Sequence, residues 1–279
     1  MSKPSKSSKS SPENRGATGR VPPGDKPHYT ASSLERIIAD RSADEDSLRQ
    51  VALSHSLNED LGLALLERRD LPRIVLEDVV KNGRAMKSRK LRIAVVMHIR
   101  TPRHLSLPLI RPLYTFELMK ISLAPQVPAD IKKAAEDVII TRMETISSGE
   151  RMTLARRSSG RVAAALLGDT KIRIVNAALN NPFLTEIGVV NAVLRDDDSQ
   201  TLTLEVAKHV KWSLRKDARA ALLRSSYTPL AYAIKFSQAF SVTALRELLQ
   251  QSKLPQNVKT YLLEMAAKRT PARHHSAGH

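Results

Sequence analysis

The residues in this sequence best suited to chemistry are two clusters of basic side chains. The first cluster lies in one short stretch, GERMTLARRSSGRVAAALL (149–167), and consists of Arg151, Arg156, Arg157 and Arg161. The second surrounds the single tryptophan and consists of Lys208, Lys211, Trp212, Arg215, Lys216 and Arg219. Arginine can donate two parallel hydrogen bonds to a phosphate, and a tryptophan ring can stack on a nucleic-acid base. These ten residues are therefore candidates for binding a polyanion.

The same residues also fit a purely structural role. Charged residues on helices usually form solvated faces, and a surface that stacks bases normally offers several aromatic side chains. Aromatic residues make up only 4% of the chain, and Trp212 stands alone among its cations. In this interpretation Trp212 packs between helices while the basic side chains face solvent.

The sequence contains no pattern typical of a catalytic, cofactor-binding or metal site. It lacks the phosphate-loop, dinucleotide-binding, zinc-protease and serine-hydrolase motifs. It also lacks cysteine, which excludes disulfides and thiolate chemistry. His98 and His104 are separated by a turn, which is poor geometry for two ligands of one metal. The run Asp196–Asp198 predicts a solvated loop, because a cation site needs further oxygen ligands.

The formal net charge of +17 is distributed unevenly along the chain. Residues 31–83 contain seven Lys/Arg and eleven Asp/Glu, whereas residues 84–279 contain thirty-two Lys/Arg and fifteen Asp/Glu. A positive field attracts nucleic acids, anionic lipids and acidic protein surfaces, and does not choose among them. The charge therefore indicates an anionic partner without identifying it.

The elements that position these residues are predicted to be helices. Four stretches, at 91–110, 118–135, 172–194 and 218–236, each contain an apolar helix, a short turn with a proline and a second apolar helix. No segment alternates polar and apolar residues with the period of two that is typical of strands. Because one helix pair cannot bury its apolar face alone, neighbouring pairs must stack. The sequence predicts an all-α fold, an α-solenoid of stacked antiparallel helix pairs.

Prolines mark the expected turns of this array. They are Pro102, Pro128, Pro182, Pro229 and Pro255. In the two Thr-Pro pairs, we expect Thr101 and Thr228 to cap a helix whose first residue is the proline. Thr185 is expected to cap the helix that follows Pro182.

These turns resemble those of a known group of repeat proteins. The stretches LRIAVVMHIRTP (91–102) and IRIVNAALNNPFLTE (172–186), and the helix–SYTP–helix stretch at 218–236, resemble HEAT-like repeats. The similarity is closer to the leucine-rich repeat variant class of bacterial helical repeats, and it covers roughly residues 48–268. The resemblance implies a HEAT-like superhelix that binds another molecule, but it implies no particular ligand.

Composition divides the chain into four segments. Residues 1–30 and 270–279 are predicted to be disordered tails, because they contain too few apolar side chains to offset the entropy of ordering. Residues 31–83 are predicted to form acidic capping repeats, and residues 84–269 a basic repeat array. No apolar run approaches the roughly 20 residues that span a membrane, and no secretory signal is found. We therefore expect a cytoplasmic protein.

Two functions remain open at this point. The first is a non-catalytic scaffold that binds a protein partner on a concave solenoid surface, with no cofactor. The alternative is a nucleic-acid-binding solenoid that contacts phosphates through its basic face. Some DNA glycosylases use a HEAT-like solenoid in this way, but no catalytic carboxylate can be placed here. Asp169 and Asp217 both suit the first turn of a helix, where the helix dipole favours carboxylates.

Overall fold

In the computed structural model, residues 30–195 and 200–269 are described, and every regular element in these ranges is helical. No strand occurs in this part of the chain, which confirms the all-α prediction. The first elements are α1 (Ala31–Ala39), α2 (Glu45–Leu53), α3 (Glu59–Leu66), α4 (Arg73–Lys81), the 3-10 helix η1 (Ala85–Lys87), α5 (Arg89–Met97), α6 (Arg103–Ile110), α7 (Thr115–Leu123) and α8 (Ala129–Thr141). The later elements are α9 (Ser148–Arg157), α10 (Gly160–Leu166), α11 (Ile172–Leu179), α12 (Glu186–Val193), α13 (Gln200–Lys208), the 3-10 helix η2 (Trp212–Leu214), α14 (Lys216–Arg224), α15 (Leu230–Ser237), α16 (Val242–Gln250) and α17 (Gln256–Arg269).

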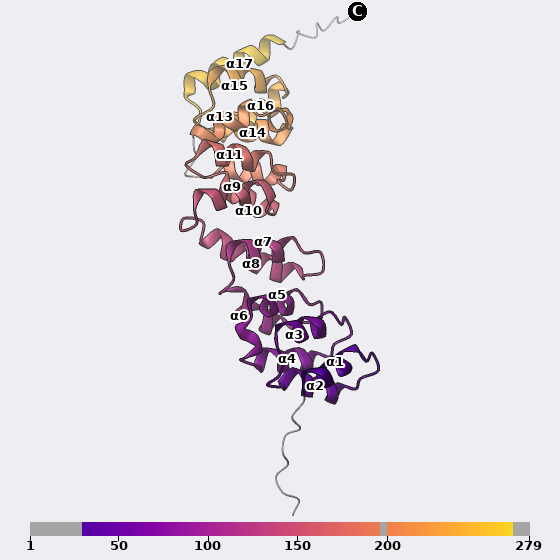
Figure 1. Ribbon diagram of the computed structural model, residues 1–279. Coiled ribbons are helices and arrows are strands. Elements are labelled where there is room, and N and C mark those ends of the chain that lie inside the picture. The colour runs from indigo at the N-terminus through magenta and orange to yellow at the C-terminus, as the bar shows by residue number, and fades with distance from the viewer. Residues whose placement is uncertain (1–29, 196–199, 270–279) are drawn as a thin grey trace, which may run out of the picture.

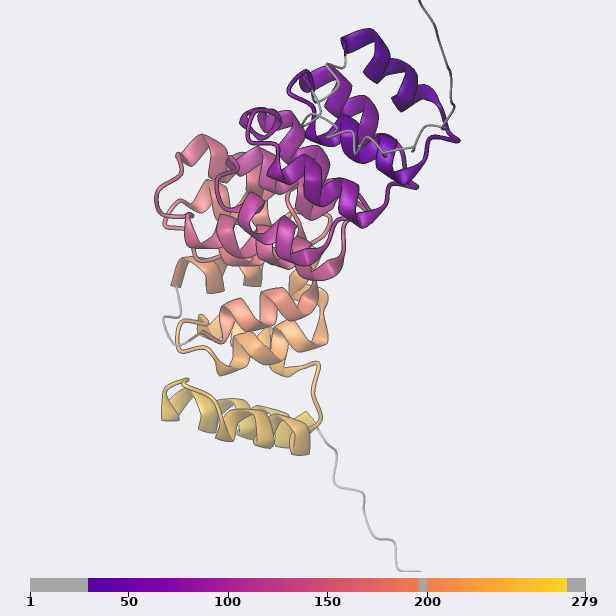
Figure 2. The ribbon, with the colours of Figure 1, turned by 90° about the horizontal axis from the view of Figure 1, so that it is seen from below.

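The helices form an elongated stack with α1 and α17 at opposite ends (Figure 1). Many consecutive helices pack against each other, as α7 and α8 do, and most helices also contact the helix two positions away in the chain. The stack is not straight, because the N-terminal helices are displaced to one side of the C-terminal ones (Figure 2). This arrangement, in which each helix contacts only its near neighbours in the sequence, is that of an α-solenoid.

Side-chain caps explain where several helices begin. The side chains of Asn58, Ser88, Thr185 and Ser241 each accept a hydrogen bond from the backbone N–H three residues later. Such a bond satisfies one of the amides that the first turn of a helix leaves without a partner. The cap expected at Thr185 is therefore confirmed.

The two Thr-Pro pairs behave differently from the expectation. Pro102 and Pro229 are themselves the N-cap residues of α6 and α15, with extended backbone angles near φ −60°. The hydroxyl of Thr101 donates to the carbonyl of Val95, at 2.6 Å, and thus closes the preceding helix. Thr228 donates to Leu222 in the same way. The prediction that these threonines cap the following helix is wrong, because their hydroxyls satisfy carbonyls of the helix before.

The solenoid consists of two equivalent halves. The elements from α1 to α8, with η1, recur in the same order as α10 to α17, with η2. For example, α5 begins at Arg89 and α14 at Lys216, and α8 begins at Ala129 and α17 at Gln256, a shift of 127 residues in both cases. Only α10 begins two residues later than this shift requires. Helix α9 joins the halves, which we call the first half (31–141) and the second half (160–269).

Individual interactions recur with the same shift. A guanidinium donates to a backbone carbonyl six residues earlier, a threonine hydroxyl does the same, and a lysine pairs with a carboxylate one turn before it. The corresponding pairs are Arg92–Met86 and Arg219–Ser213, Thr101–Val95 and Thr228–Leu222, and Lys81–Asp78 and Lys208–Glu205. Equal spacing and equal hydrogen bonds together indicate a tandem duplication of one helical unit.

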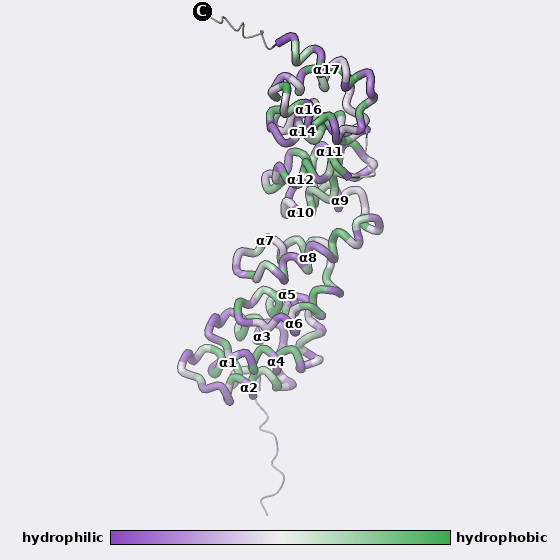
Figure 3. Tube along the Cα trace, turned by 180° about the vertical axis from the view of Figure 1, so that it is seen from behind, coloured by the Kyte–Doolittle hydropathy of each residue, from purple (hydrophilic) through white to green (hydrophobic). Residues whose placement is uncertain are grey.

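The apolar core is divided into two clusters that meet within α5. The smaller cluster runs from Leu34 to Val95, and the larger one from Val96 to Ala266. Each cluster is formed by helices in which apolar and polar residues are interspersed, as expected for amphipathic helices (Figure 3). The expected boundary at residue 83 stays a prediction, and the predicted tails lie almost entirely outside the described residues. Among the described helices, none is long and apolar enough to span a membrane.

Candidate functional site

Several of the candidate basic residues have partners within the protein. The Nε atom of Arg151 lies 3.1 Å from a carboxylate oxygen of Asp169, whose side chain is almost completely buried. Arg161 forms ion pairs with Glu136, at 3.5 Å, and with Asp137. These two arginines therefore connect neighbouring helices, and an external phosphate would have to compete with their carboxylates.

The second cluster is partly structural as well. Lys208 pairs with Glu205 at 3.7 Å, one turn earlier on α13. The Nε atom of Arg219 donates to the carbonyl of Ser213 at 2.6 Å, which ties α14 to η2. The side chain of Arg219 also lies over the Phe236 ring. Both cations therefore already have partners within the protein.

Trp212 lies inside the stack. Only 1% of its surface is exposed, and its indole N–H donates to the carbonyl of Leu179 at 2.8 Å. The ammonium group of Lys211 lies 4.0 Å from the centre of the ring. The ring is therefore not available to stack on a base, and its position agrees with packing between helices.

The five remaining candidates lie near the ends of α9 and α13 and at the start of α14. They are Arg156, Arg157, Lys211, Arg215 and Lys216, and all are exposed. None of them forms an ion pair with a carboxylate of a described residue. We call these five residues the basic edge.

Hydrogen bonds between helix ends align this edge. The amide of Asn181, which follows α11, donates to the carbonyls of Ala155 and Ser158 at the end of α9. Trp212, which follows α13, donates to Leu179 at the end of α11. The C-terminal ends of α9, α11 and α13 therefore lie in this order along the stack. The turn that follows α11 separates Arg157 from Lys211.

His209 is part of the turn that holds Trp212 in place. Its Nδ1 atom accepts hydrogen bonds from the backbone N–H groups of Lys211, at 3.2 Å, and Trp212, at 3.4 Å. Burial, and to a smaller extent the charge of Lys211, lower the pKa of this imidazole below 6.5. In the first half, Asn82 has the equivalent position, and its side-chain oxygen accepts from Ala85.

This histidine leads to a prediction about pH. Below about pH 6.5 the unfolded chain binds a proton at His209 more readily than the folded chain does. The free energy of unfolding is therefore expected to decrease as the pH is lowered. In His209→Asn the amide oxygen accepts the same hydrogen bonds without titrating. Urea unfolding between pH 7.5 and 5 should show a smaller loss of stability in His209→Asn than in the parent protein. Equal losses would contradict the role given to His209.

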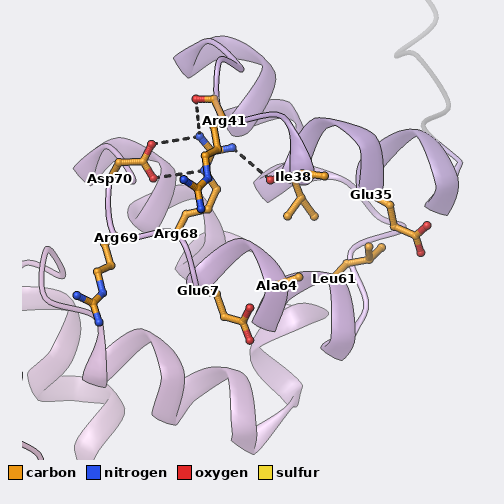
Figure 4. Close-up of a pocket in the computed structure, with 10 residues that line it drawn as sticks. Glu35, Ile38, Arg41, Leu61, Ala64, Glu67, Arg68, Arg69 and Asp70 are labelled. Atoms are coloured by element: carbon orange, nitrogen blue, oxygen red, sulfur yellow. Dashed lines mark hydrogen bonds and ion pairs between the residues drawn. The ribbon is translucent and has the colours of Figure 1, made fainter.

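A different surface carries grooves. It is formed by α1, α3, α5 and α7 in the first half and by α10, α12, α14 and α16 in the second, and we call it the groove layer. The first groove, about 740 Å³, lies between α1 and α3 and has Ile38, Leu61 and Ala64 on its floor (Figure 4). At one end, Arg68 pairs with Asp70 and donates to the carbonyl of Ile38.

The second groove, about 890 Å³, involves α3, α5 and α7. Its apolar lining includes Met97 and Ile99, and Ile99 is 60% exposed. Three cations, Arg69, Lys90 and Lys120, line it, with Glu67 as the single lining carboxylate among the described residues. Of these cations, Lys90 is already paired with Glu59 at 2.7 Å. This groove is therefore apolar inside and positive around its rim.

The second half repeats both grooves. A groove of about 630 Å³ lies between α10 and α12, and a smaller one of about 240 Å³ lies between α12, α14 and the turn before α17. They contain the exposed apolar side chains Phe183, Ile187 and Leu194, of which Ile187 is 72% exposed. The cations Arg161 and Arg195 line the larger groove, although Arg161 already has carboxylate partners.

The groove layer is not evident from the sequence. Its apolar residues read as ordinary members of amphipathic helices, and only the structure shows that they remain exposed beside cations. Identical residues 127 positions apart, such as Arg92 and Arg219 or Pro102 and Pro229, were the available signal.

Among the described residues, no group of three or more His, Cys, Asp or Glu side chains is placed to hold a metal ion. Comparison with known proteins found no matching family model, no matching curated protein and no matching solved structure. The class of the protein thus follows from its own geometry: an all-α solenoid of two equivalent halves.

Proposed function

We propose that this chain is a non-catalytic helical-repeat scaffold of HEAT-like type that binds a protein partner along the groove layer. The observation that supports this most strongly is that both halves have grooves at equivalent positions of the same layer. Exposed large apolar side chains gathered in concave surfaces are typical of binding sites. Ile99 and Ile187 are the most exposed of those that line the grooves.

The chemistry of the grooves favours an acidic partner. The second groove combines an apolar lining with the cations Arg69 and Lys120, beside Lys90, which is paired with Glu59. Its equivalent in the second half contains only cations among its charged described residues. A polypeptide segment with apolar side chains between carboxylates would complement both features. The proposed partner is therefore an acidic, partly apolar segment of another protein.

The basic edge supports a second candidate, the binding of a nucleic acid. Its five cations are exposed and free of carboxylate partners among the described residues. We rank this function second, because Trp212 is buried and Arg151, Arg161 and Lys208 are paired within the protein. Measuring duplex DNA binding at increasing salt tests it, since a phosphate binder loses affinity steeply.

Selection from a displayed library of random peptides tests the protein-binding function. We expect the immobilised protein to enrich peptides with alternating acidic and apolar residues. Affinity of the enriched peptides should fall about tenfold or more in Ile99→Asp or Ile187→Asp, because each change removes an apolar contact and adds a like charge.

Val210→Asp is the matched control, because Val210 is 83% exposed but lines none of the described grooves. It should bind the selected peptides as the parent does. Enrichment of basic peptides, or an equal loss in all three variants, would show that the groove layer is not the binding surface.

A further inference from the structure

The smallest groove differs in charge from its equivalent in the first half. Five of its lining residues stand 127 positions after residues that line the groove of α3, α5 and α7. In the second half, Arg224 replaces Met97, Lys253 replaces Gln126, and Leu194 replaces Glu67; these pairs occupy equivalent positions. The framework of the two halves is the same, but at these shared positions the pocket of the second half has two additional cations and lacks a carboxylate.

The structure holds the cations of this pocket close together. The backbone N–H of Lys253 donates to the carbonyl of Arg224 at 2.8 Å, which places these residues side by side. Arg195 also lines the pocket and is anchored through a hydrogen bond to the carbonyl of Ala164 at 3.1 Å. None of the described lining residues is acidic.

Arg224 contributes a second, independent observation. Its Nε atom is buried and has no hydrogen-bond partner among the described residues. The buried Nε atom thus forms no bond that would fix the guanidinium group to another residue. Arg224 also lines the pocket, where an oxyanion would accept from the rest of its guanidinium group in the planar geometry that this group favours.

We propose that this pocket, lined by Arg195, Arg224 and Lys253, is a binding site for a small oxyanion of the size of a phosphate group. The volume of about 240 Å³ suits a phosphoryl group and is small for a nucleotide. Asp217 and Glu247 stand where the wider first-half groove has Lys90 and Lys120, and neither lines the pocket. A long polyanion would approach these carboxylates, whereas a single small ion would not. This site does not depend on the proposed protein partner.

Titration calorimetry with inorganic phosphate at low ionic strength tests the site. The parent protein is expected to bind one phosphate saturably, and Arg224→Met should lower its affinity about tenfold or more. This change restores the residue that the equivalent first-half position holds, and Lys253→Gln does the same for the lysine. Arg173→Met, an exposed change outside the described pocket, should bind phosphate as the parent does.

Two results would overturn the proposal. One is no saturable phosphate binding by the parent, or equal binding by the parent, Arg224→Met and Lys253→Gln. The other concerns Asp196, Asp197 and Asp198, which follow Arg195 and lie outside the described residues. If phosphate binds only after all three are replaced by asparagine, the cations serve the chain's own carboxylates. Thermal melts of each variant establish that the variants compared are folded.

Discussion

Replacing Trp212 by alanine is expected to lower the free energy of unfolding by about 3–5 kcal/mol. The side chain is the largest of the fully buried residues, so its removal leaves a cavity between α11, η2 and α14. The change also leaves the carbonyl of Leu179 without the indole donor that now lies 2.8 Å away. Chemical unfolding followed by circular dichroism measures the loss.

Leu214→Ala is the control, because Leu214 belongs to the same 3-10 helix but is 65% exposed. It should change stability by less than about 0.5 kcal/mol. If Trp212→Ala melted like this control and instead lost affinity for nucleic acid, Trp212 would be a stacking residue and the packing role would be wrong.

The second large effect is expected at Gly160, the first residue of α10. A Cβ atom there would lie 2.1 Å from the carbonyl oxygen of Phe183 and 2.9 Å from its carbon. Both atoms belong to the backbone of the turn between α11 and α12, so this turn must move to admit a methyl group. Gly160→Ala should therefore cost about 1–3 kcal/mol in urea unfolding.

Gly149→Ala, in the adjacent helix α9, is expected to change the stability in the opposite direction. The nearest atom to a Cβ at Gly149 is the hydroxyl of Ser147 at 3.9 Å, which is ordinary contact. Alanine is the better helix former, so this change should stabilise the protein by about 0.5–1 kcal/mol. If Gly160→Ala were as stable as the parent or more stable, as Gly149→Ala is expected to be, the close contact between α10 and the α11–α12 turn would not exist.

The sequence predicts the helical architecture because its signals are local. Proline positions, caps such as Thr185 and the absence of strand periodicity all act within a few residues. The Thr-Pro pairs show the limit of this reasoning. A threonine hydroxyl can form a hydrogen bond with the helix that follows it or with the helix that precedes it. At Thr101 and Thr228 the hydroxyl bonds backward in both halves.

The duplication is harder to see in the sequence than in the structure. The carbonyls of Ala52 and Leu179 are equivalent, but Asn82 donates to the first and Trp212, three positions after the equivalent of Asn82, donates to the second. Two unlike side chains thus satisfy the same backbone group, so the sequences diverged while the geometry remained. A comparison of hydrogen-bond roles identifies the equivalence that residue identities obscure.

The candidate functional site could not be predicted from the sequence for a related reason. Whether a cation is available for a ligand depends on contacts between segments that are distant in the sequence. Arg161 forms an ion pair with Asp137, and Arg151 forms one with Asp169. The basic clusters therefore contain both paired and exposed members, which a charge count cannot separate. The grooves require the stacking of helices that are not consecutive in the chain.

The central claim is that the groove layer, and not the basic edge, is the principal binding surface. Hydrogen exchange with and without a peptide selected by display tests this claim most directly. We expect slower exchange in the exposed turns and helix ends of the groove layer, around Ile99, Phe183 and Ile187, and unchanged exchange around Lys211 and Arg215. Slower exchange around Lys211 and Arg215, with none around Ile99 or Ile187, would contradict it.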